Sequence, residues 1–334
     1  MKWKIAVGVL LSALFLWLAF RNANLGEVAL AVRSANYLWM IPMVAITLVS
    51  FALRAWRWKY LFPGEKPAFG PLFRSTFIGF MGNNVLPARL GELMRVYAIG
   101  QSAGISRSVA LGSLVIERIL DMSMLLLLFA IVMAAGRLPE EVRSWGLYLL
   151  AFAGPILIGA ILFRAYSERI LPKLERFLPP GIRARVLQMA ANFRDGLGVL
   201  GRPSDLARAT VLSLLMWGSL VFVVVCGFRS LDLHLPADAG GIVLVVMAIG
   251  TMIPSAPGFI GTLQYAGALA LRQYGVDPSL ALSFTLIYHA SQWFPVTALG
   301  FYYFIRQHLS LKRMVAPNSG EAEQGPITWG KHGA

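Results

Sequence analysis

The most constraining feature of this sequence is a series of apolar runs, each close to the length that an α-helix needs to cross a membrane. About 20 mostly apolar residues span the hydrocarbon core of a bilayer. Such runs recur six times, at Ile5–Phe20, Leu38–Phe51, Leu111–Ala135, Leu147–Phe163, Leu206–Phe228 and Ala281–Ile305. Only 14% of the residues are charged and 57% are hydrophobic, whereas soluble domains carry about 25% charged residues. The sequence therefore predicts an all-α polytopic membrane protein with six transmembrane helices.

The distribution of positive charge indicates how these runs are oriented. The formal net charge is +14, and Lys and Arg accumulate in the cytoplasmic loops of membrane proteins. Basic residues follow the second run, and nine more lie between positions 164 and 208. Both segments are predicted to be cytoplasmic, which places both termini in the cytoplasm and the chain in the cytoplasmic membrane. Anionic lipid headgroups are the expected partners and nucleic acid is not, because the basic residues alternate with apolar runs.

The order of these segments predicts five parts. They are a signal-anchor span with an external loop (1–34), a first membrane half (35–163), a cytoplasmic amphipathic linker (164–205), a second membrane half (206–306) and a disordered cytoplasmic tail (307–334). A cleaved signal peptide is the alternative for the first run, but no small-residue cleavage site follows it cleanly before Arg21. Helical spacing from Ile182 to Leu200 predicts an amphipathic helix, either a connector on the membrane face or a lipid sensor.

Two further apolar segments are interrupted by proline and glycine. Residues 71–100 are broken at Asn83–Arg89, and residues 240–274 are broken at Ile253–Gly261. The loop charges agree with six spans only if each segment enters and leaves on one side, the first from the cytoplasm and the second from outside; full spans are the alternative. The two re-entrant hairpins would then form an inverted repeat. Broken segments at matching places in two inverted halves indicate a transporter's binding site.

Three charged residues lie near the middle of the third run. Glu117, Arg118 and Asp121 each cost roughly 2.5–3.5 kcal/mol at the bilayer centre, so they are expected to face other polar groups. Glu117 and Asp121 are four residues apart and share one helix face. The second limb of the first hairpin supplies candidate partners, namely Arg89, Glu92 and Arg95.

Two interpretations of these charges are open. The first is a self-neutralising ion network that only fixes the helices in place. The second is an anion site in which Arg89, Arg95 and the helix amides after Pro87 bind a phosphate. The acidic residues Glu92, Glu117 and Asp121 would then occupy this anion site or gate it. Arginine suits this role because its planar guanidinium can grip a phosphate through two hydrogen bonds.

The second hairpin is neutral. Its polar residues are Ser255, Thr262, Gln264 and Tyr265, and the last run adds Tyr288, His289, Ser291 and Gln292. We expect His289 to be a hydrogen-bonded structural residue rather than a proton relay. At the end of the second run, Arg54 and Arg57 are expected to anchor the helix at the membrane interface, with headgroup contact as the alternative.

Signatures of enzymes are scarce. The sequence has no His/Cys cluster with metal spacing, no nucleophile elbow and no phosphate-binding glycine loop. Its single cysteine, Cys226, lies in an apolar run. Glu117 and Asp121 are candidate ligands for a divalent metal, but Arg118 beside them argues against it. We therefore expect no cofactor and no metal.

Three motifs resemble the transmembrane region of lysylphosphatidylglycerol synthases, over about residues 35–306. They are N-x3-P-x-R-x-G-E-x2-R from Asn83, E-R-x2-D from Glu117 and P-x2-P-G-x2-G from Pro254. The resemblance implies a flippase-like protein, since this part of the bacterial synthases is regarded as a flippase and a separate soluble domain transfers the amino acid. Only a short tail follows the last run here, so transferase activity is not expected. Gln264 stands where the family often has an acidic residue, which disfavours a cationic lysyl headgroup.

The leading expectation is a flippase-like transporter of a phosphate-bearing lipid, such as a phospholipid, a polyprenyl-phosphate or a glycolipid precursor. The alternatives are a membrane scaffold for a separate lipid-modifying enzyme, which would then be a partner, and an integral-membrane transferase. The candidate substrate-binding residues are Asn83, Asn84, Pro87, Arg89, Glu92, Arg95, Glu117, Arg118, Asp121, Pro254, Pro257, Gly258, Gly261, Gln264 and Tyr288.

Overall fold

The computed structural model describes residues 2–64, 66–134, 201–253 and 255–309, together with isolated residues between 135 and 200. These residues form α-helices and short 3-10 turns and contain no strand. The α-helices are α1 (Lys2–Phe20), α2 (Leu25–Ser34), α3 (Met40–Tyr60), α4 (Phe69–Val85), α5 (Gly91–Ala103), α6 (Arg107–Ala134), α9 (Pro203–Ser230), α10 (Ala239–Met252), α11 (Thr262–Arg272) and α12 (Pro278–Arg306). The predicted all-α architecture is confirmed for this part of the chain.

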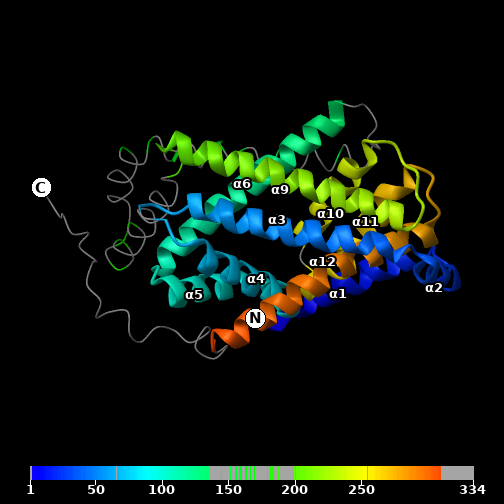
Figure 1. Ribbon diagram of the computed structural model, residues 1–334, viewed down its shortest axis with the longest axis horizontal. Helices are drawn as coiled ribbons and strands as arrows, with labels where there is room; N and C mark the ends of the chain where they lie inside the picture. The colour runs from blue at the N-terminus through cyan, green and yellow to red at the C-terminus, as the bar shows by residue number, and fades with distance from the viewer. Residues whose placement is uncertain are drawn as a thin grey trace, which may run out of the picture.

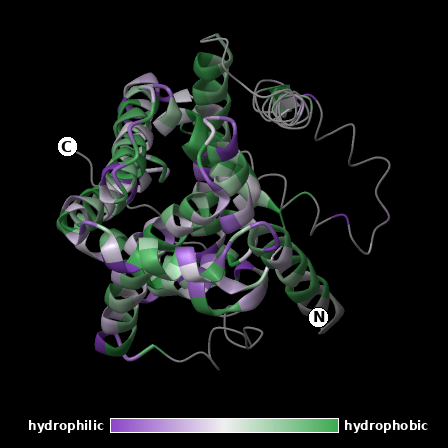
Figure 2. Ribbon diagram, turned by 90° about the vertical axis from the view of Figure 1, so that its right-hand side faces the viewer, coloured by the Kyte–Doolittle hydropathy of each residue, from purple (hydrophilic) through white to green (hydrophobic). Residues whose placement is uncertain are grey.

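The longest helices form the frame of the molecule. Helices α3 and α9 lie side by side along the long axis, and α12 packs on α4, α2 and α3 (Figure 1). Hydrophobic ribbon covers long stretches of the outer helices (Figure 2). Several large apolar side chains on these helices remain 64–68% exposed, namely Leu10, Ile41, Phe222, Phe294 and Ile305. An apolar surface of this extent is typical of a protein that faces lipid.

Not every predicted span is long and apolar enough to cross a bilayer by itself. Among the described residues, Tyr37–Tyr60 and Pro203–Ser230 meet both criteria. Val7–Phe20 and Leu25–Ser34 meet them as a pair bent by 84°, so part of the predicted external loop is helix α2. Only isolated residues of the predicted run Leu147–Phe163 are described. Crossing the membrane is supported, and the count of six spans stays a prediction.

Both interrupted segments fold back on themselves. Helices α4 and α5 pack on each other, and so do α10 and α11. The first pair approaches closely through glycine, because a Cβ on Gly91 would lie 1.9 Å from the carbonyl oxygen of Gly79 and 2.4 Å from the amide nitrogen of Asn83. In the second pair, a Cβ on Gly250 would lie 2.5 Å from the Cβ of Ala266. Each interrupted segment is therefore a helical hairpin, and its placement in the membrane stays a prediction.

The turns of the two hairpins agree at their first and third residues and differ elsewhere, since Leu90 is helical whereas Ile260 is extended. The turn η2 (Pro87–Arg89) and the turn η4 (Pro257–Phe259) both begin with proline, and their third residues, Arg89 and Phe259, have φ of 55° and 59°. Residues other than glycine rarely adopt this left-handed backbone conformation. The two turns contact each other, and the hairpins lie toward opposite ends of α3 (Figure 1). The hairpins thus approach from opposite ends and meet at their tips.

Helix α1 packs against α11, and Ser12 of α1 accepts a hydrogen bond from the amide of Ala256 beside η4, at 2.6 Å. Only isolated residues of the predicted amphipathic helix at 182–200 are described, and the predicted tail beyond residue 309 lies outside the described residues.

Candidate functional site: a buried cluster of arginines and carboxylates

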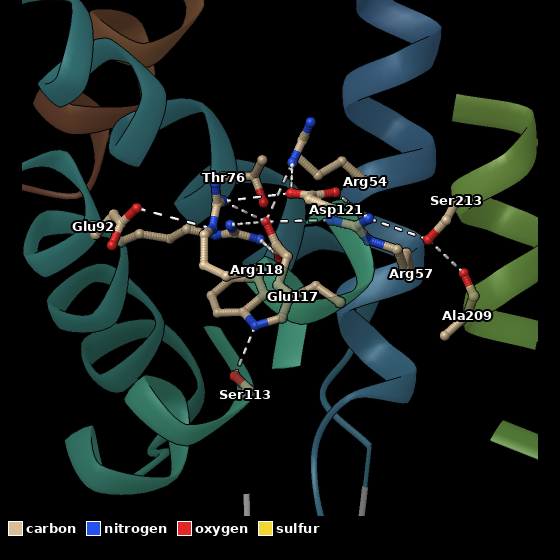
Figure 3. Close-up of polar contacts among 12 residues, drawn as sticks. Arg54, Arg57, Thr76, Glu92, Ser113, Glu117, Arg118, Asp121, Ala209 and Ser213 are labelled. Atoms are coloured by element: carbon tan, nitrogen blue, oxygen red, sulfur yellow. Dashed lines mark hydrogen bonds and ion pairs between the residues drawn. The ribbon is translucent and has the colours of Figure 1, made fainter. Parts of the chain in front are cut away.

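Charged side chains from three helices gather where α3, α5 and α6 approach one another (Figure 3). Helix α6 supplies the carboxylates Glu117 and Asp121, which lie on one face because they are four residues apart. The guanidinium groups come from Arg54 and Arg57 of α3, Arg95 of α5 and Arg118 of α6. We call these six residues the arginine–carboxylate cluster.

Arg95 uses both of its Nη atoms within the cluster. Its Nη1 and Nη2 donate to the two oxygens of Glu117, at 2.8 and 2.9 Å. Its guanidinium also stacks on the ring of Trp58, 3.8 Å from the ring centre, and the indole of Trp58 donates to Ser113 at 2.8 Å. Arg95 and Glu117 are almost completely buried. This pair was predicted from the sequence and is confirmed, and it joins the first hairpin to α6.

Arg57 joins the cluster to the second half of the chain. Its Nη1 donates to Asp121 at 2.6 Å and to the hydroxyl of Ser213 on α9 at 3.2 Å. Ser213 in turn donates to the carbonyl of Ala209 at 2.8 Å. The side chain of Arg57 is fully buried and its Nη2 also lies 3.4 Å from Glu117, so removing Asp121 would leave this buried charge with one carboxylate partner instead of two.

Two arginines form the accessible rim of the cluster. Arg54 contacts Asp121 at 3.2 Å and Glu117 at 3.4 Å, and its side chain is 12% exposed. Arg118 contacts Glu117 at 3.2 Å, yet its side chain is 41% exposed. On its outer side, Arg118 Nε lies 4.0 Å from Oε1 of Glu92, which is 37% exposed (Figure 3). An incoming anion would therefore meet Arg118 and Arg54 first.

The cluster holds more positive than negative charge. Its four arginines face two carboxylates, which leaves two positive charges unmatched, or one if Glu92 is counted. Within the described part of the chain, the buried Nε atoms of Arg57, Arg95 and Arg118 donate to no acceptor. Native proteins pair nearly all of their buried polar atoms. An arrangement of this kind can bind an anion that supplies several acceptor oxygens.

The structure corrects two of the sequence-based assignments. Arg54 and Arg57 were expected to anchor α3 at the membrane interface. Instead, they form ion pairs with Glu117 and Asp121 inside the protein. Arg89 was expected to pair with the carboxylates of α6. Helix α5 begins only at Gly91, so Arg89 lies in the preceding turn, and its Nη2 donates to the carbonyl of Thr251 in α10 at 2.9 Å.

Neutral side chains surround the hairpin tips. Gln264 accepts from the amide of Gly261 at 2.7 Å, and its amide nitrogen lies 2.9 Å from Nδ1 of His289, which agrees with the expected structural role of that histidine. Asn84 donates to Thr297 at 2.9 Å. Sequence reasoning missed Thr297, since an isolated threonine in an apolar helix carries no signal of its own.

The remaining candidate residues take other positions. Asn83 lies beside Gly91, and its buried Oδ1 accepts no hydrogen bond from the described residues. Gly258 lies in the second turn with φ of 70°, beside the indole of Trp293. Tyr288 packs on Phe284 in the apolar core, away from the cluster. Pro254 lies outside the described residues. No group of three His, Cys, Asp or Glu that could hold a metal ion is present in the described ranges.

Curated relatives of this chain come from archaea. A UPF0104 membrane protein of Methanocaldococcus jannaschii is 26% identical over 224 residues, which cover 65% of this chain and 90% of that protein. The UPF0104 membrane protein of Methanothermobacter thermautotrophicus is 22% identical over 319 residues, covering 90% of this chain and 94% of the relative. The glycosyltransferase AglD of Haloferax volcanii is 24% identical over 322 residues, which cover 86% of this chain. They cover 51% of AglD, so the chain spans about half of that protein.

No solved structure matches the chain. The family that its sequence does match is the lysylphosphatidylglycerol synthase TM region, over residues 5–300. The match includes both hairpins and all six residues of the arginine–carboxylate cluster. This chain is a membrane protein that belongs to the family of the lysylphosphatidylglycerol synthase TM region.

Proposed function

We propose that this protein is a flippase-like transporter that moves a phosphate-bearing lipid between the leaflets of the cytoplasmic membrane. The observation that carries the proposal is the surplus of arginine in the cluster, where four guanidinium groups face two carboxylates. A structural ion network needs only equal numbers of both signs. A phosphate would supply the missing negative charge and would accept hydrogen bonds from more than one arginine.

The proposal divides the cluster into a fixed part and a substrate-facing part. Arg57 and Arg95 are buried and form ion pairs with the carboxylates, so their guanidinium groups do not bind the substrate. Arg54 and Arg118 are accessible and bind the headgroup phosphate. This assignment moves the phosphate ligands from Arg89 and Arg95 to the rim, because Arg95 is engaged by Glu117 and Trp58.

The hairpins supply the proposed route between the leaflets. Under this proposal both are re-entrant, the first from the cytoplasm and the second from outside, and they are related as an inverted repeat. The proline and the positive φ that both turns contain, and the contact between the tips, support it. Folded-back backbone of this kind is tolerated at membrane depth where it is buried in protein or lines a cavity. Relative movement of the two tips would open the cluster to one side and then to the other.

One relative favours a glycolipid precursor, a lipid that carries a sugar, as the transported substrate. AglD is named a glycosyltransferase, and this chain matches about half of it. Lipid-linked sugars commonly carry a phosphate, which is the group the rim arginines would bind. The proposed role is transport, with no transfer of an amino acid or a sugar by this chain itself.

Lipid translocation in reconstituted vesicles tests this proposal. The wild-type protein is expected to expose fluorescent phosphatidylglycerol to an external quencher faster than protein-free vesicles do. Arg118→Ala should slow this movement roughly tenfold or more, because a charge-assisted hydrogen bond is worth about 1.5–3 kcal/mol. Arg306→Ala, at the exposed end of α12, is the matched control and should move the lipid at the wild-type rate. Equal rates in wild type and Arg118→Ala would contradict the assignment.

A further inference from the structure

The weakest contact of the arginine–carboxylate cluster lies at its accessible edge. Arg118 Nε and Glu92 Oε1 are 4.0 Å apart, beyond hydrogen-bonding distance, and both side chains are more than one third exposed. The other carboxylate contacts of Arg118 run to Glu117, which is fully buried, and to Asp121, which is 13% exposed. Exposed pairs at such separations contribute little to stability. Glu92 is therefore the one acidic group in these contacts that can leave Arg118 without uncovering a buried charge.

The carboxylates of α6 cannot take over this role. Glu117 receives both Nη atoms of Arg95 and further contacts from Arg54, Arg57 and Arg118. Asp121 is held by Arg57 at 2.6 Å and by Arg54 at 3.2 Å. With these oxygens occupied, the acidic group that remains beside the unsatisfied Nε of Arg118 is Glu92, at 4.0 Å.

The position of Glu92 explains why its carboxylate is stable beside Arg118 when no substrate is bound. It lies in the first turn of α5, where the helix dipole favours a negative charge. It also belongs to the first hairpin, whereas Arg118 belongs to α6. The contact between them thus links the first hairpin to α6, and breaking it frees Arg118 for an anion without disturbing the buried pair of Arg95 and Glu117.

Resting on the proposed function, we infer that Glu92 is an exchangeable resident anion, which a lipid phosphate displaces from Arg118. Binding of the phosphate and loss of the contact between Glu92 and Arg118 are then one event, while the buried pair of Arg95 and Glu117 continues to join α5 to α6. The ligand class is a lipid with an anionic phosphate headgroup. Glu92 competes with it directly, so removing the negative charge of Glu92 should strengthen binding, while removing Arg118 should weaken it.

The experiment measures binding of short-chain lipids to the purified full chain in detergent. Dihexanoylphosphatidate is the probe, dihexanoylglycerol is the same lipid without phosphate, and inorganic phosphate tests the headgroup alone. Glu92→Gln should bind dihexanoylphosphatidate about two- to fivefold more tightly than wild type, the range expected for loss of a weak exposed pair. Arg118→Ala should bind it roughly tenfold more weakly. Asp232→Asn is the control for net charge, since Asp232 is exposed, carries positive φ that asparagine tolerates, and lies on the loop after α9.

The outcomes separate this inference from the proposed function. Tight binding by wild type with no change in Glu92→Gln would overturn the exchange and leave the transport proposal standing. Equal binding of dihexanoylphosphatidate and dihexanoylglycerol by wild type would remove the phosphate site, and with it both proposals. An affinity gain in Glu92→Gln that appears equally for inorganic phosphate would make free phosphate the ligand and overturn the lipid assignment. A gain of the same size in Asp232→Asn would reduce the effect to net charge and overturn the exchange.

Discussion

The turns of the two hairpins have some backbone features in common, but the first hairpin carries charged side chains and the second carries neutral ones. Each turn begins with proline, places its third residue at positive φ and ends two residues later at a glycine, Gly91 or Gly261. The second limb of the first hairpin carries Glu92 and Arg95 into a cluster of charges. The second limb of the other carries Gln264 into neutral hydrogen bonds with its own helix start and with His289. The backbone thus sets where the tips meet, and the side chains set what each tip can bind.

This difference also separates the energetic roles of the hairpins. A buried charged cluster is costly to disturb, because each ion loses hydration and depends on its partners. Neutral hydrogen bonds contribute about 0.5–1.5 kcal/mol each, so the loss of one lowers the stability less. The first hairpin should therefore tolerate substitution less than the second, and the following variants test that comparison.

The largest effect is expected for Glu117→Ala, which leaves Arg95 without its bidentate partner and Arg57 with one carboxylate fewer. Removing one partner of a buried pair costs about 3–5 kcal/mol. Gln264→Ala removes neutral hydrogen bonds and should cost about 1–2 kcal/mol. The midpoints of thermal unfolding in detergent should rank wild type above Gln264→Ala and Gln264→Ala above Glu117→Ala. A reversed order would show that the neutral tip, and not the charged cluster, carries the stability.

A smaller effect is expected from closing the glycine contacts. Gly91→Ala places a methyl group 1.9 Å from the carbonyl oxygen of Gly79, so α4 and α5 must separate, at about 1–3 kcal/mol for overpacking. Gly250→Ala meets the Cβ of Ala266 at 2.5 Å and should cost less, because its nearest contact is longer. Gly218→Ala in α9 is the control, since no described atom lies within 4 Å of the added carbon. The fraction of monodisperse protein on size-exclusion chromatography, with the unfolding midpoint, measures the difference. Equal values for Gly91→Ala and Gly218→Ala would contradict the close approach.

The smallest effect is expected where the tips join. Arg89→Gly removes the hydrogen bond to the carbonyl of Thr251, while glycine adopts the positive φ without strain. The two changes oppose each other, so the unfolding midpoint should move little. Hydrogen exchange should nevertheless quicken in the amides near the end of α10, because the link between the tips is gone. Unchanged exchange there would mean that packing alone, including Phe259 beneath Arg89, holds the tips together.

Much of the architecture could be predicted from local patterns. Apolar runs identified α3, α9 and α12, and proline with glycine identified both hairpins. The cost of charge inside a membrane singled out Glu117 and Asp121, and the contact with Arg95 was anticipated. These signals are local, because each depends on residues close together in the chain and on the solvent around them.

The assignments that failed depend on contacts between distant segments. Arg54 and Arg57 look like interface anchors because they stand at the end of an apolar run, and only the approach of α3 to α6 turns them inward. Arg89 looks like a third charge on the face of α5, but the helix begins two residues later. In both cases a basic residue had several possible partners, and the packing of the helices selected one.

The sequence by itself determined that this protein belongs in a membrane, that its chain is helical and that two apolar segments are interrupted at proline and glycine. Hydrophobic length and backbone geometry fix these features without reference to distant residues. Only the tertiary structure decided which arginines face which carboxylates, and that Arg54 and Arg118 stay accessible while Arg57 and Arg95 do not. Coulomb attraction does not distinguish one guanidinium from another, so distance and burial in the folded chain make that choice.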